Sequence, residues 1–428
     1  MRSIGLDVHR QFAEVAVAQG GQAVPSGHRF EATPAGLLAF ARSLGKEDQV
    51  VLEATVNTWA IVDVLAAHAG RVVVSNPLRT RAIASAKVKT DKIDAATLAQ
   101  LLAADFLPEV WIPDPETRSR RAQVAHRAGL VQQRSRLRNR VEAVLHRNLL
   151  ECPWTDTFGK RGCQWLAHLN LPSADREQLD STLRQLDCME AEVARADQLI
   201  AETTLGDPRI QRLMTIPGVG VTTAAALVAV VGDVARFPRP NQLVGYLGLD
   251  PRVRQSGNKP AYTGHISRQG QAHARGLLVE AAHAAVRRPG PLRAFYLRIR
   301  ARRGSQVALV AVARKLAILT WHLLTKGEDY HWASPTRTAE KLRAVAIKAG
   351  APKLPNGRPG VPRARRGAGE DLPSAHRSVE ALRKRADEDG LALQAEQAYR
   401  TLVAGHARDR RGSGAAGRRL LDEAGPMV

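Results

Sequence analysis

The chain has 428 residues, enough for two or three domains with their own hydrophobic cores. Its 63 lysines and arginines exceed its 41 acidic residues, and the formal net charge of +22 favours a polyanionic partner, above all nucleic acid. Three cysteines without metal-ligand spacing argue against a disulfide framework, and Arg314 and Lys315 interrupt the most apolar long stretch. We therefore expect a cytoplasmic protein with no membrane span.

The N-terminal quarter of the chain alternates between short apolar runs and helical stretches, which predicts an α/β unit. Three strands come first, followed by alternating helices and strands. This is the order of elements in an RNase H-like fold, where acids at the ends of the first and fourth strands meet acids on a late helix. The predicted strands are 2–7, 12–18, 27–31, 49–53 and 71–75, and the predicted helices begin near residues 34, 57, 77 and 91.

Four carboxylates stand where such a fold brings side chains to one point. Asp7 and Glu53 each end an apolar strand, and Asp91 and Asp94 open a helix three residues apart, on one face. Carboxylate oxygens suit Mg²⁺, and two such ions can hold both oxygens of a phosphodiester displacement. The alternative is that these are strand-end acids and acids favoured by a helix dipole, and spacing alone leaves both interpretations open.

A long basic helix is predicted over 116–150, followed by a second helical stretch at about 175–203. The two are predicted to pair as an antiparallel coiled coil, with an irregular cap between them. Between residues 118 and 148 the first helix has nine arginines and one acid, Glu142. This lack of compensating acids predicts contact with a phosphate backbone, through Arg134 and Arg138 among others. A solvated charged face is the simpler alternative.

The run Ile216-Pro217-Gly218-Val219-Gly220 precedes a helix of small residues and resembles a helix-hairpin-helix turn. Its glycines, Gly218 and Gly220, would let backbone amides approach a phosphate at the start of that helix. The alternative is a tight turn between packed helices.

A basic, loop-rich segment is predicted at about 250–270, before two closing helices at 271–287 and 305–325. Ser256 lies there among four cations, and a serine can attack a phosphodiester if cations and metal stabilise the developing charge. From these residues alone, a hydroxyl that merely contacts a phosphate is the favoured interpretation. The surrounding cations are Arg252, Arg254, Lys259 and Arg268.

Beyond about residue 345 the chain is rich in proline, glycine and arginine, which predicts disorder, with short helical patterns near 374–387 and 391–405 and a basic tail. The thirteen histidines show no ligand spacing, and we assign none of them to metal binding or to proton transfer.

Taken together and in order, these motifs resemble one family of insertion-sequence transposases, with an N-terminal RuvC-like DEDD domain and a C-terminal transposase domain, and also the related Piv-type DNA invertases. The resemblance covers about residues 1–330. The motifs are Ile4-Gly5-Leu6-Asp7, Leu52-Glu53-Ala54-Thr55, Asn76-Pro77, Lys89-Thr90-Asp91-Lys92-Ile93-Asp94-Ala95, Ile216-Pro217-Gly218-Val219-Gly220, and Gly248-Leu249-Asp250-Pro251 through Ser256-Gly257.

The resemblance implies a division into four parts. These are a RuvC-like, RNase H-like α/β catalytic domain at 1–110, a basic helical coiled-coil linker at 111–206, a mainly α transposase domain at 207–330, and a basic, partly disordered extension at 331–428. The extension is longer than the usual end of the family.

The resemblance also implies a chemistry. Asp7, Glu53, Asp91 and Asp94 would bind Mg²⁺, as two ions, and Ser256 would be the nucleophile of strand exchange through a covalent serine–DNA intermediate. The acids of one domain and the serine of the other would meet across a homodimer or homotetramer. Donor and target DNA would be the substrates, a structured bridge RNA would guide them by base pairing, and the protein would act at the nucleoid of a bacterial cell.

One departure and two rival functions accompany this expectation. Residues 56–59 stand where the family has a glycine and an aromatic residue, so the turn after Glu53 can differ. The first rival is a RuvC-like nuclease that uses metal-activated water, and the second is a nucleic-acid-binding protein without catalysis.

Overall fold

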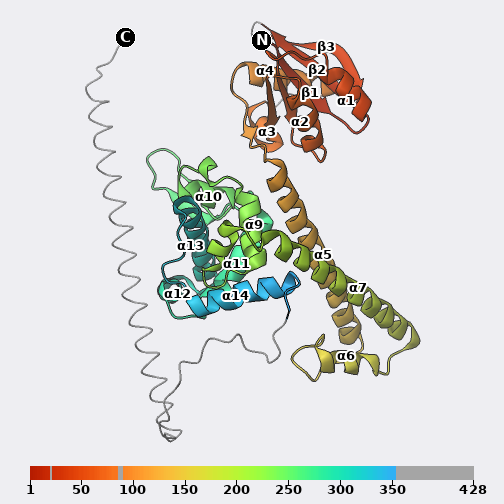
Figure 1. The fold of residues 1–428 in the computed structure, drawn as a ribbon, viewed down its shortest axis with the longest axis vertical. Helices are drawn as coiled ribbons and strands as arrows, with labels where there is room; N and C mark the ends of the chain where they lie inside the picture. The colour runs from red at the N-terminus through yellow and green to blue at the C-terminus, as the bar shows by residue number, and fades with distance from the viewer. Residues whose placement is uncertain (20–21, 85–89, 353–428) are drawn as a thin grey trace, which may run out of the picture. The chain divides into compact units, whose positions relative to one another are not determined.

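The computed structural model describes residues 1–19, 22–84 and 90–352. The chain divides into two compact units, Met1–Asp114 and Pro115–Val428 (Figure 1). The helical patterns predicted near 374–387 and 391–405, and the basic tail, lie outside the described residues.

The first unit is built on a six-stranded sheet with the order β3-β2-β1-β4-β5-β6. β1 runs antiparallel to β2 and parallel to β4, and β4 runs parallel to β5. The mixed sheet confirms the predicted α/β unit, and its order is consistent with an RNase H-like fold. The strands are β1 (Ser3–Val8), β2 (Phe12–Gln19), β3 (Gln22–Glu31), β4 (Gln49–Glu53), β5 (Arg71–Ser75) and β6 (Glu109–Val110).

Side-chain alternation along the strands separates two cores, one on each face of the sheet. Leu6 and Leu52 pack toward α1 (Pro34–Ala41) and α2 (Thr58–Ala66). Val51, the neighbour of Leu52, packs on the other face, against Leu98 and Leu102 of α4 (Asp91–Ala103). A further short helix, α3 (Pro77–Ile83), follows β5.

A glycine in β1 lets α4 lie directly on the sheet. A Cβ atom added at Gly5 would lie 2.0 Å from the carbonyl oxygen of Ala95 and 2.6 Å from the backbone nitrogen of Ala99, closer than real atoms approach. Ala95 and Ala99 stand one turn apart on α4 and are fully buried. Because neither partner has a bulky side chain here, the helix backbone rests on the strand backbone, which fixes where the first turn of α4 lies.

The second unit begins with two long helices, α5 (Pro115–Arg147) and α7 (Ser173–Thr204), which pack side by side (Figure 1). Leu130 of α5 packs on Val193 and Ala196 of α7. Arg127 pairs with Asp197 and Arg147 with Asp175, so the position on α7 falls as that on α5 rises, and the two helices run antiparallel. The supercoiling of a coiled coil stays a prediction. The segment between them, predicted as irregular, contains one more helix, α6 (Lys160–Ala167), whose Leu166 packs on the ends of both long helices.

Most arginines of α5 have partners elsewhere in the second unit. Arg127 pairs with Asp197 of α7, and Arg134 and Arg138 pair with Glu190, at 3.2 and 2.6 Å. The prediction that these arginines lack compensating acids is wrong, because the acids come from a different helix and a pattern within one helix cannot show them. Further contacts are those of Arg120 with Glu116 and Asp207, Arg121 with the carbonyl oxygens of Ala229 and Val230, and Arg147 with Asp175.

The remainder of the second unit is mainly helical, with one two-stranded hairpin. The hairpin, α12 and α14 were not predicted. β7 of the hairpin and α12 are strongly basic, which explains why no apolar pattern marked them. The elements are α8 (Pro208–Met214), α9 (Val221–Val231), η1 (Val234–Arg236), α10 (Pro240–Tyr246), β7 (Pro251–Arg254), β8 (Tyr262–Ile266), α11 (Ala272–Ala285), α12 (Pro291–Arg303), α13 (Ser305–Lys326) and α14 (Pro335–Lys348).

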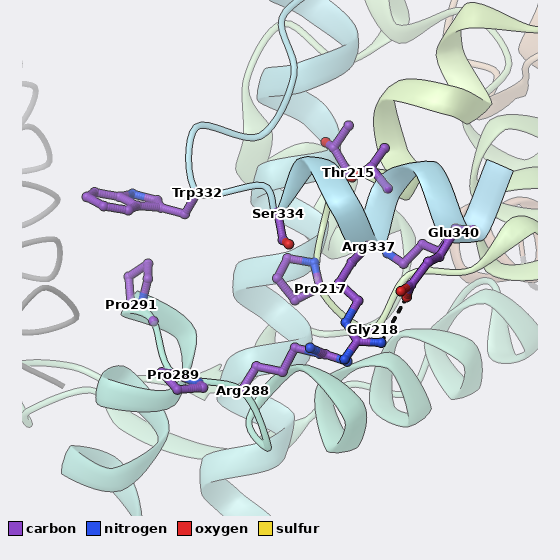
Figure 2. Close-up of a pocket in the computed structure, with 13 residues that line it drawn as sticks. Thr215, Pro217, Gly218, Arg288, Pro289, Pro291, Trp332, Ser334, Arg337 and Glu340 are labelled. Atoms are coloured by element: carbon purple, nitrogen blue, oxygen red, sulfur yellow. Dashed lines mark hydrogen bonds and ion pairs between the residues drawn. The ribbon is translucent and has the colours of Figure 1, made fainter. Parts of the chain in front are cut away.

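The last described helix, α14, closes over the turn between α8 and α9 (Figure 2). The ammonium of Lys341 donates hydrogen bonds to the carbonyl oxygens of Met214 and Ile216, at 2.6 and 2.9 Å. Val345 of α14 and Tyr330 join the buried core. The packed unit therefore continues past the boundary predicted at residue 330.

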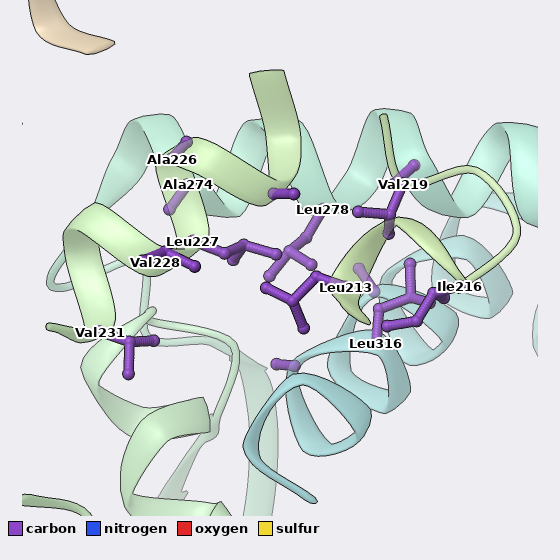
Figure 3. Close-up of a cluster of buried hydrophobic side chains, with 14 of the residues drawn as sticks. Leu213, Ile216, Val219, Ala226, Leu227, Val228, Val231, Ala274, Leu278 and Leu316 are labelled. Carbon is purple, nitrogen blue, oxygen red and sulfur yellow. The ribbon is translucent and has the colours of Figure 1, made fainter. Parts of the chain in front are cut away.

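One large hydrophobic core holds α8, α9, α11 and α13 together (Figure 3). Leu213, Ile216, Leu227, Leu278 and Leu316 meet at its centre, each at most 1 % exposed. By length and composition alone, α13 is the one helix in the described ranges that could cross a membrane, and most of its apolar side chains belong to or pack against this core.

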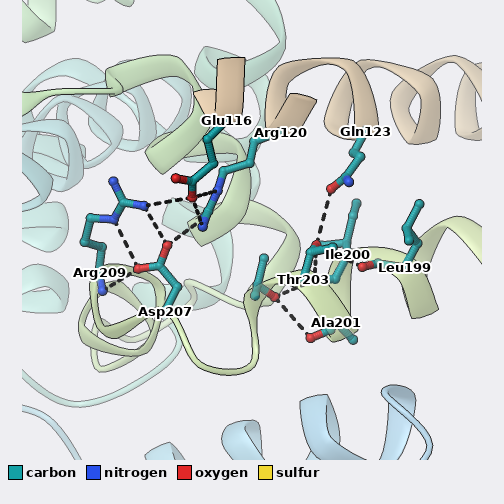
Figure 4. Close-up of polar contacts among 10 residues, drawn as sticks. Glu116, Arg120, Gln123, Leu199, Ile200, Ala201, Thr203, Asp207 and Arg209 are labelled. Carbon is teal, nitrogen blue, oxygen red and sulfur yellow. Dashed lines mark hydrogen bonds and ion pairs between the residues drawn. The ribbon is translucent and has the colours of Figure 1, made fainter. Parts of the chain in front are cut away.

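The buried acid Asp207 bonds to arginines of both α5 and α8 and so connects the two helices (Figure 4). Asp207 accepts hydrogen bonds from the backbone and guanidinium of Arg209, at 2.9 and 2.8 Å, and from Arg120 at 2.6 Å. Burial alone would raise the pKa of Asp207, but the hydrogen bonds from Arg209 and Arg120 outweigh it and lower that pKa to about 2.

Gly218 should be intolerant of a side chain. Its φ is +82°, and an added Cβ would lie 2.2 Å from the carbonyl oxygen of Ala281, so Gly218→Ala should destabilise the second unit by about 2 kcal/mol or more. Gly220 is the matched control, since its φ is −99° and nothing lies within 4 Å of an added Cβ. Gly220→Ala should cost less than about 1 kcal/mol. Urea unfolding of both variants, followed by circular dichroism, measures the difference, and equal losses would contradict this account.

Asp207 should make the second unit sensitive to acid. Because its pKa is lowered from 3.8 to about 2, its stabilisation of about 2 kcal/mol is present above about pH 5 and is lost as the pH falls toward 2. The stability difference between the wild type and Asp207→Asn, measured by urea unfolding at each pH, should shrink over that range. Asp187→Asn, at an exposed acid of α7, controls for the loss of one negative charge. A difference that stays constant with pH would contradict the assignment.

Candidate functional site

The sheet brings Asp7 and Glu53 to the same edge and the same face. β1 and β4 are parallel neighbours, with Leu6 beside Leu52, so the next residues, Asp7 and Glu53, end the two strands side by side. Leu6 and Leu52 point toward α1 and α2, and alternation therefore turns both acids to the face that α4 covers.

The first turn of α4 supplies the other two acids. Thr90 caps the helix, its hydroxyl accepting a hydrogen bond from the backbone nitrogen of Ile93, so Asp91 and Asp94 stand in the first turn, where the helix dipole favours negative charge. The contact of α4 with Gly5 places this turn next to the end of β1.

A histidine that was not predicted joins these acids. The Nε2 atom of His9 lies 3.1 Å from Oδ2 of Asp7 and 3.3 Å from Oδ2 of Asp91, and ligand atoms of all three side chains lie within 4.8 Å of one another. That group does not include Glu53 or Asp94. The available signal was the spacing Asp7-x-His9, since residues two apart at a strand end lie on one face; a search for longer ligand motifs overlooks it.

The electrostatics of Asp7 show how close the acids are. Burial raises the pKa of Asp7, the nearby His9 lowers it, and Asp91 and Asp94 both raise it. Both acids therefore act on the Asp7 carboxylate. A divalent cation would relieve this repulsion, and the donor set of carboxylate oxygens with one imidazole suits such an ion.

The hairpin of β7 and β8 carries the predicted serine in its connecting loop. Ser256 is exposed, and the carbonyl oxygen of Ser256 accepts a hydrogen bond of 3.4 Å from the backbone nitrogen of Lys259. Gly257 has a φ of +55°, which lets the loop turn directly after the serine. An ion pair of 3.1 Å between Asp250 and Arg314 of α13 holds the base of the hairpin.

Three of the predicted basic residues gather beside this loop. Arg252, Arg254 and Arg268 line one groove of about 440 Å³ together with Tyr262 and His265. Arg252 also donates a hydrogen bond to the carbonyl oxygen of Ser267, at 3.2 Å. The groove is concave, cationic and partly aromatic, as a surface that receives a phosphate backbone would be.

The other predicted contact residues have structural roles in addition to any contact with nucleic acid. Arg134 and Arg138 bind Glu190, and Gly218 packs against α11. Gly220 is the N-cap residue of α9, and nothing lies within 4 Å of a Cβ atom added there. Whether these four residues contact nucleic acid stays a prediction.

Two family models match the chain. One, described as "Transposase IS116/IS110/IS902 family", matches residues 210–297, which contain the α8–α9 turn and the serine hairpin. The other is the IS110-type DEDD model, described as "Transposase", and it matches residues 4–148, which contain all four acids.

Several curated relatives are similar over most of their length. A "Probable family 20 transposase" of Pseudomonas aeruginosa is 31 % identical over 57 % of this chain and 75 % of its own. The transposase for insertion sequence element IS1111A of Coxiella burnetii is 31 % identical over 56 % of this chain and 68 % of its own. The pilin gene-inverting protein of Moraxella lacunata is 26 % identical over 64 % and 76 %.

His9 should contribute a nitrogen ligand when a divalent cation binds. Adjacent ligands of an octahedral ion with bonds of about 2.1 Å lie about 3.0 Å apart, close to the observed distances from His9 to the two carboxylates. With Mn²⁺ as probe, pulsed electron paramagnetic resonance should detect imidazole nitrogen coupling in the wild type.

The His9→Gln variant should still bind Mn²⁺ but lose that coupling, whereas Asp91→Asn should weaken Mn²⁺ binding itself. No coupling in the wild type would mean that His9 only hydrogen-bonds to the acids.

Proposed function

This chain belongs to the IS116/IS110/IS902 family of transposases, and we propose that it exchanges DNA strands by Mg²⁺-dependent chemistry through a covalent serine–DNA intermediate. The observation that carries the proposal is the convergence of Asp7, Asp91 and Asp94 at the end of β1, with Glu53 at the end of the adjacent strand.

The acids are assigned to metal binding. Asp7, Glu53, Asp91 and Asp94 would hold two Mg²⁺ ions, with His9 beside them. When bound, the ions would stabilise negative charge on the attacking and leaving oxygens of the phosphodiester. The acids come from three rigid elements, which keeps their positions fixed while a flexible DNA strand is fitted to them.

Ser256 is assigned as the nucleophile. Its Oγ gives up a proton and forms a bond to phosphorus, while the bond from phosphorus to one deoxyribose oxygen breaks and that oxygen takes up a proton. The reverse attack of a deoxyribose hydroxyl on the serine ester rejoins a strand and frees the serine. Arg252, Arg254 and Arg268, which line the neighbouring groove, would hold the phosphate backbone, and Lys259 stands in the serine loop itself.

Donor and target DNA are the proposed substrates, and a structured bridge RNA is the proposed guide. In this division of labour, base pairing selects the sequence and the basic surfaces hold backbones, which fits a net charge of +22. The proposal includes a catalytic domain at 1–110, a coiled-coil linker at 111–206, a transposase domain from 207, a homodimer or homotetramer, and action at the bacterial nucleoid.

The test is to trap the covalent adduct. The protein would be incubated with RNA transcribed from the DNA that flanks its gene, Mg²⁺, and labelled donor and target DNA, then run on a denaturing gel. Label at protein size is expected for the wild type and is expected to be absent for Ser256→Ala. Ser267→Ala, at the other serine of the hairpin segment, is the matched control and should form the adduct, because within the described part of the chain Ser267 makes its hydrogen bonds through backbone atoms.

Other outcomes separate the rivals. Cleavage without an adduct, unchanged in Ser256→Ala, would replace the serine mechanism by hydrolysis with activated water. Nucleic-acid binding without cleavage or joining, for several RNA and target choices, would favour a binding protein without catalysis.

A further inference from the structure

A second basic pocket lies on the second unit, lined by residues that have no role in the proposed chemistry (Figure 2). Its volume is about 530 Å³, within the range of pockets that hold small organic ligands. The turn between α8 and α9, the segment between α11 and α12, and the start of α14 form its walls.

The walls are fixed by the fold. Lys341 of α14 donates hydrogen bonds to the carbonyl oxygens of Met214 and Ile216, and the backbone nitrogen of Tyr330 donates to the hydroxyl of Thr215 at 2.9 Å. Gly218 rests against the backbone of α11. The pocket is therefore preformed, and a ligand need not order its walls.

Charge and aromatic surface are combined in this pocket. Arg288, in the segment between α11 and α12, and Arg337 of α14 extend into it, and Lys341 adds a third positive charge. Glu340 is the one acid among its lining residues. Glu340 pairs with Arg337 at 2.8 Å. Arg288 is exposed, and no side-chain partner is recorded for it among the described residues.

Trp332 stands at the rim with 41 % of its surface exposed, an unusual position for the largest apolar side chain. Its neighbour His331 packs edge-on against the indole, with ring centres 4.9 Å apart. An exposed tryptophan at the rim of a pocket that also contains two arginines suits a ligand that carries a flat ring and phosphates.

We propose that this pocket binds a short single-stranded segment of nucleic acid, with one unpaired base stacked on Trp332 at the rim and a backbone phosphate of the same segment held by Arg288 and Arg337. A duplex presents phosphates but keeps its bases stacked inside, so it cannot use the tryptophan. The proposal rests on nucleic acid as the partner of this protein, but neither on the acids nor on Ser256.

The test uses generic strands, without guide RNA and without Mg²⁺. Oligothymidylate that carries one 5-iodouracil would be irradiated with the full-length protein, and the crosslinked residue would be identified by mass spectrometry. The same experiment with oligouridylate shows whether the pocket prefers RNA or DNA. A third sample, the DNA strand paired with its complement, tests binding of a duplex. A crosslink to Trp332 from at least one single strand, and little from the duplex, is expected.

Binding affinities of variants test each contact. Trp332→Ala should weaken single-strand binding about tenfold or more, and Trp332→Phe should recover most of it. The control is Trp154→Ala, since Trp154 is 38 % exposed outside this pocket. Arg288→Gln should lower the slope of log affinity against log salt by about 0.7, whereas Arg195→Gln, at an exposed arginine of α7, should change that slope less.

Three results would overturn the proposal: equal affinities of Trp332→Ala and Trp154→Ala, a crosslink that maps elsewhere, or equal crosslinking of the duplex. Circular dichroism of each variant confirms that it is folded. Because these measurements require no recombination, a missing serine adduct would not affect them, and failure here would leave the serine mechanism intact.

Discussion

The contact between α4 and β1 at Gly5 determines the geometry of the acidic site. The sheet alone brings Asp7 and Glu53 together, but Asp91 and Asp94 reach them only because α4 lies directly on the strand backbone. Small residues on both partners allow this approach, and a side chain at position 5 would clash with the backbone of α4 and push the helix away. The site therefore depends on a residue that has no functional group.

Positive charge in this protein has two different uses. Along α5, arginines bind acids of α7 and carbonyl oxygens of α9, and they hold the second unit together. In the serine hairpin and in the Trp332 pocket, positive residues outnumber acids among the lining residues. Net charge alone cannot separate these roles, since both raise it equally. The two roles are distinguished by whether a positive side chain pairs with an acid or carbonyl oxygen of the protein.

Much of the first unit could be predicted from sequence, because its strands are apolar and its helices begin at recognisable caps such as Thr90. Alternation along β1 and β4 also predicts that Asp7 and Glu53 share an edge. The spacing Asp7-x-His9 could have indicated the contact of His9 with Asp7, but the contact of His9 with Asp91 could not be read from sequence, because it depends on how α4 packs. The hairpin around Ser256 was missed for another reason: its strands are short and mostly exposed, so no buried face produced an alternating pattern.

The ion pairs between α5 and α7 occur at three levels, at Arg127, at Arg134 with Arg138, and at Arg147. Together they fix the register of the two helices, because sliding one helix past the other by a single turn, about 5.4 Å, would break the ion pairs at all three levels. A helix of 33 residues is about 50 Å long. The two packed helices therefore form a rigid rod. α6 packs where α5 ends and α7 begins, so its distance from the opposite end of the rod is fixed. A flexible tether could not fix that distance.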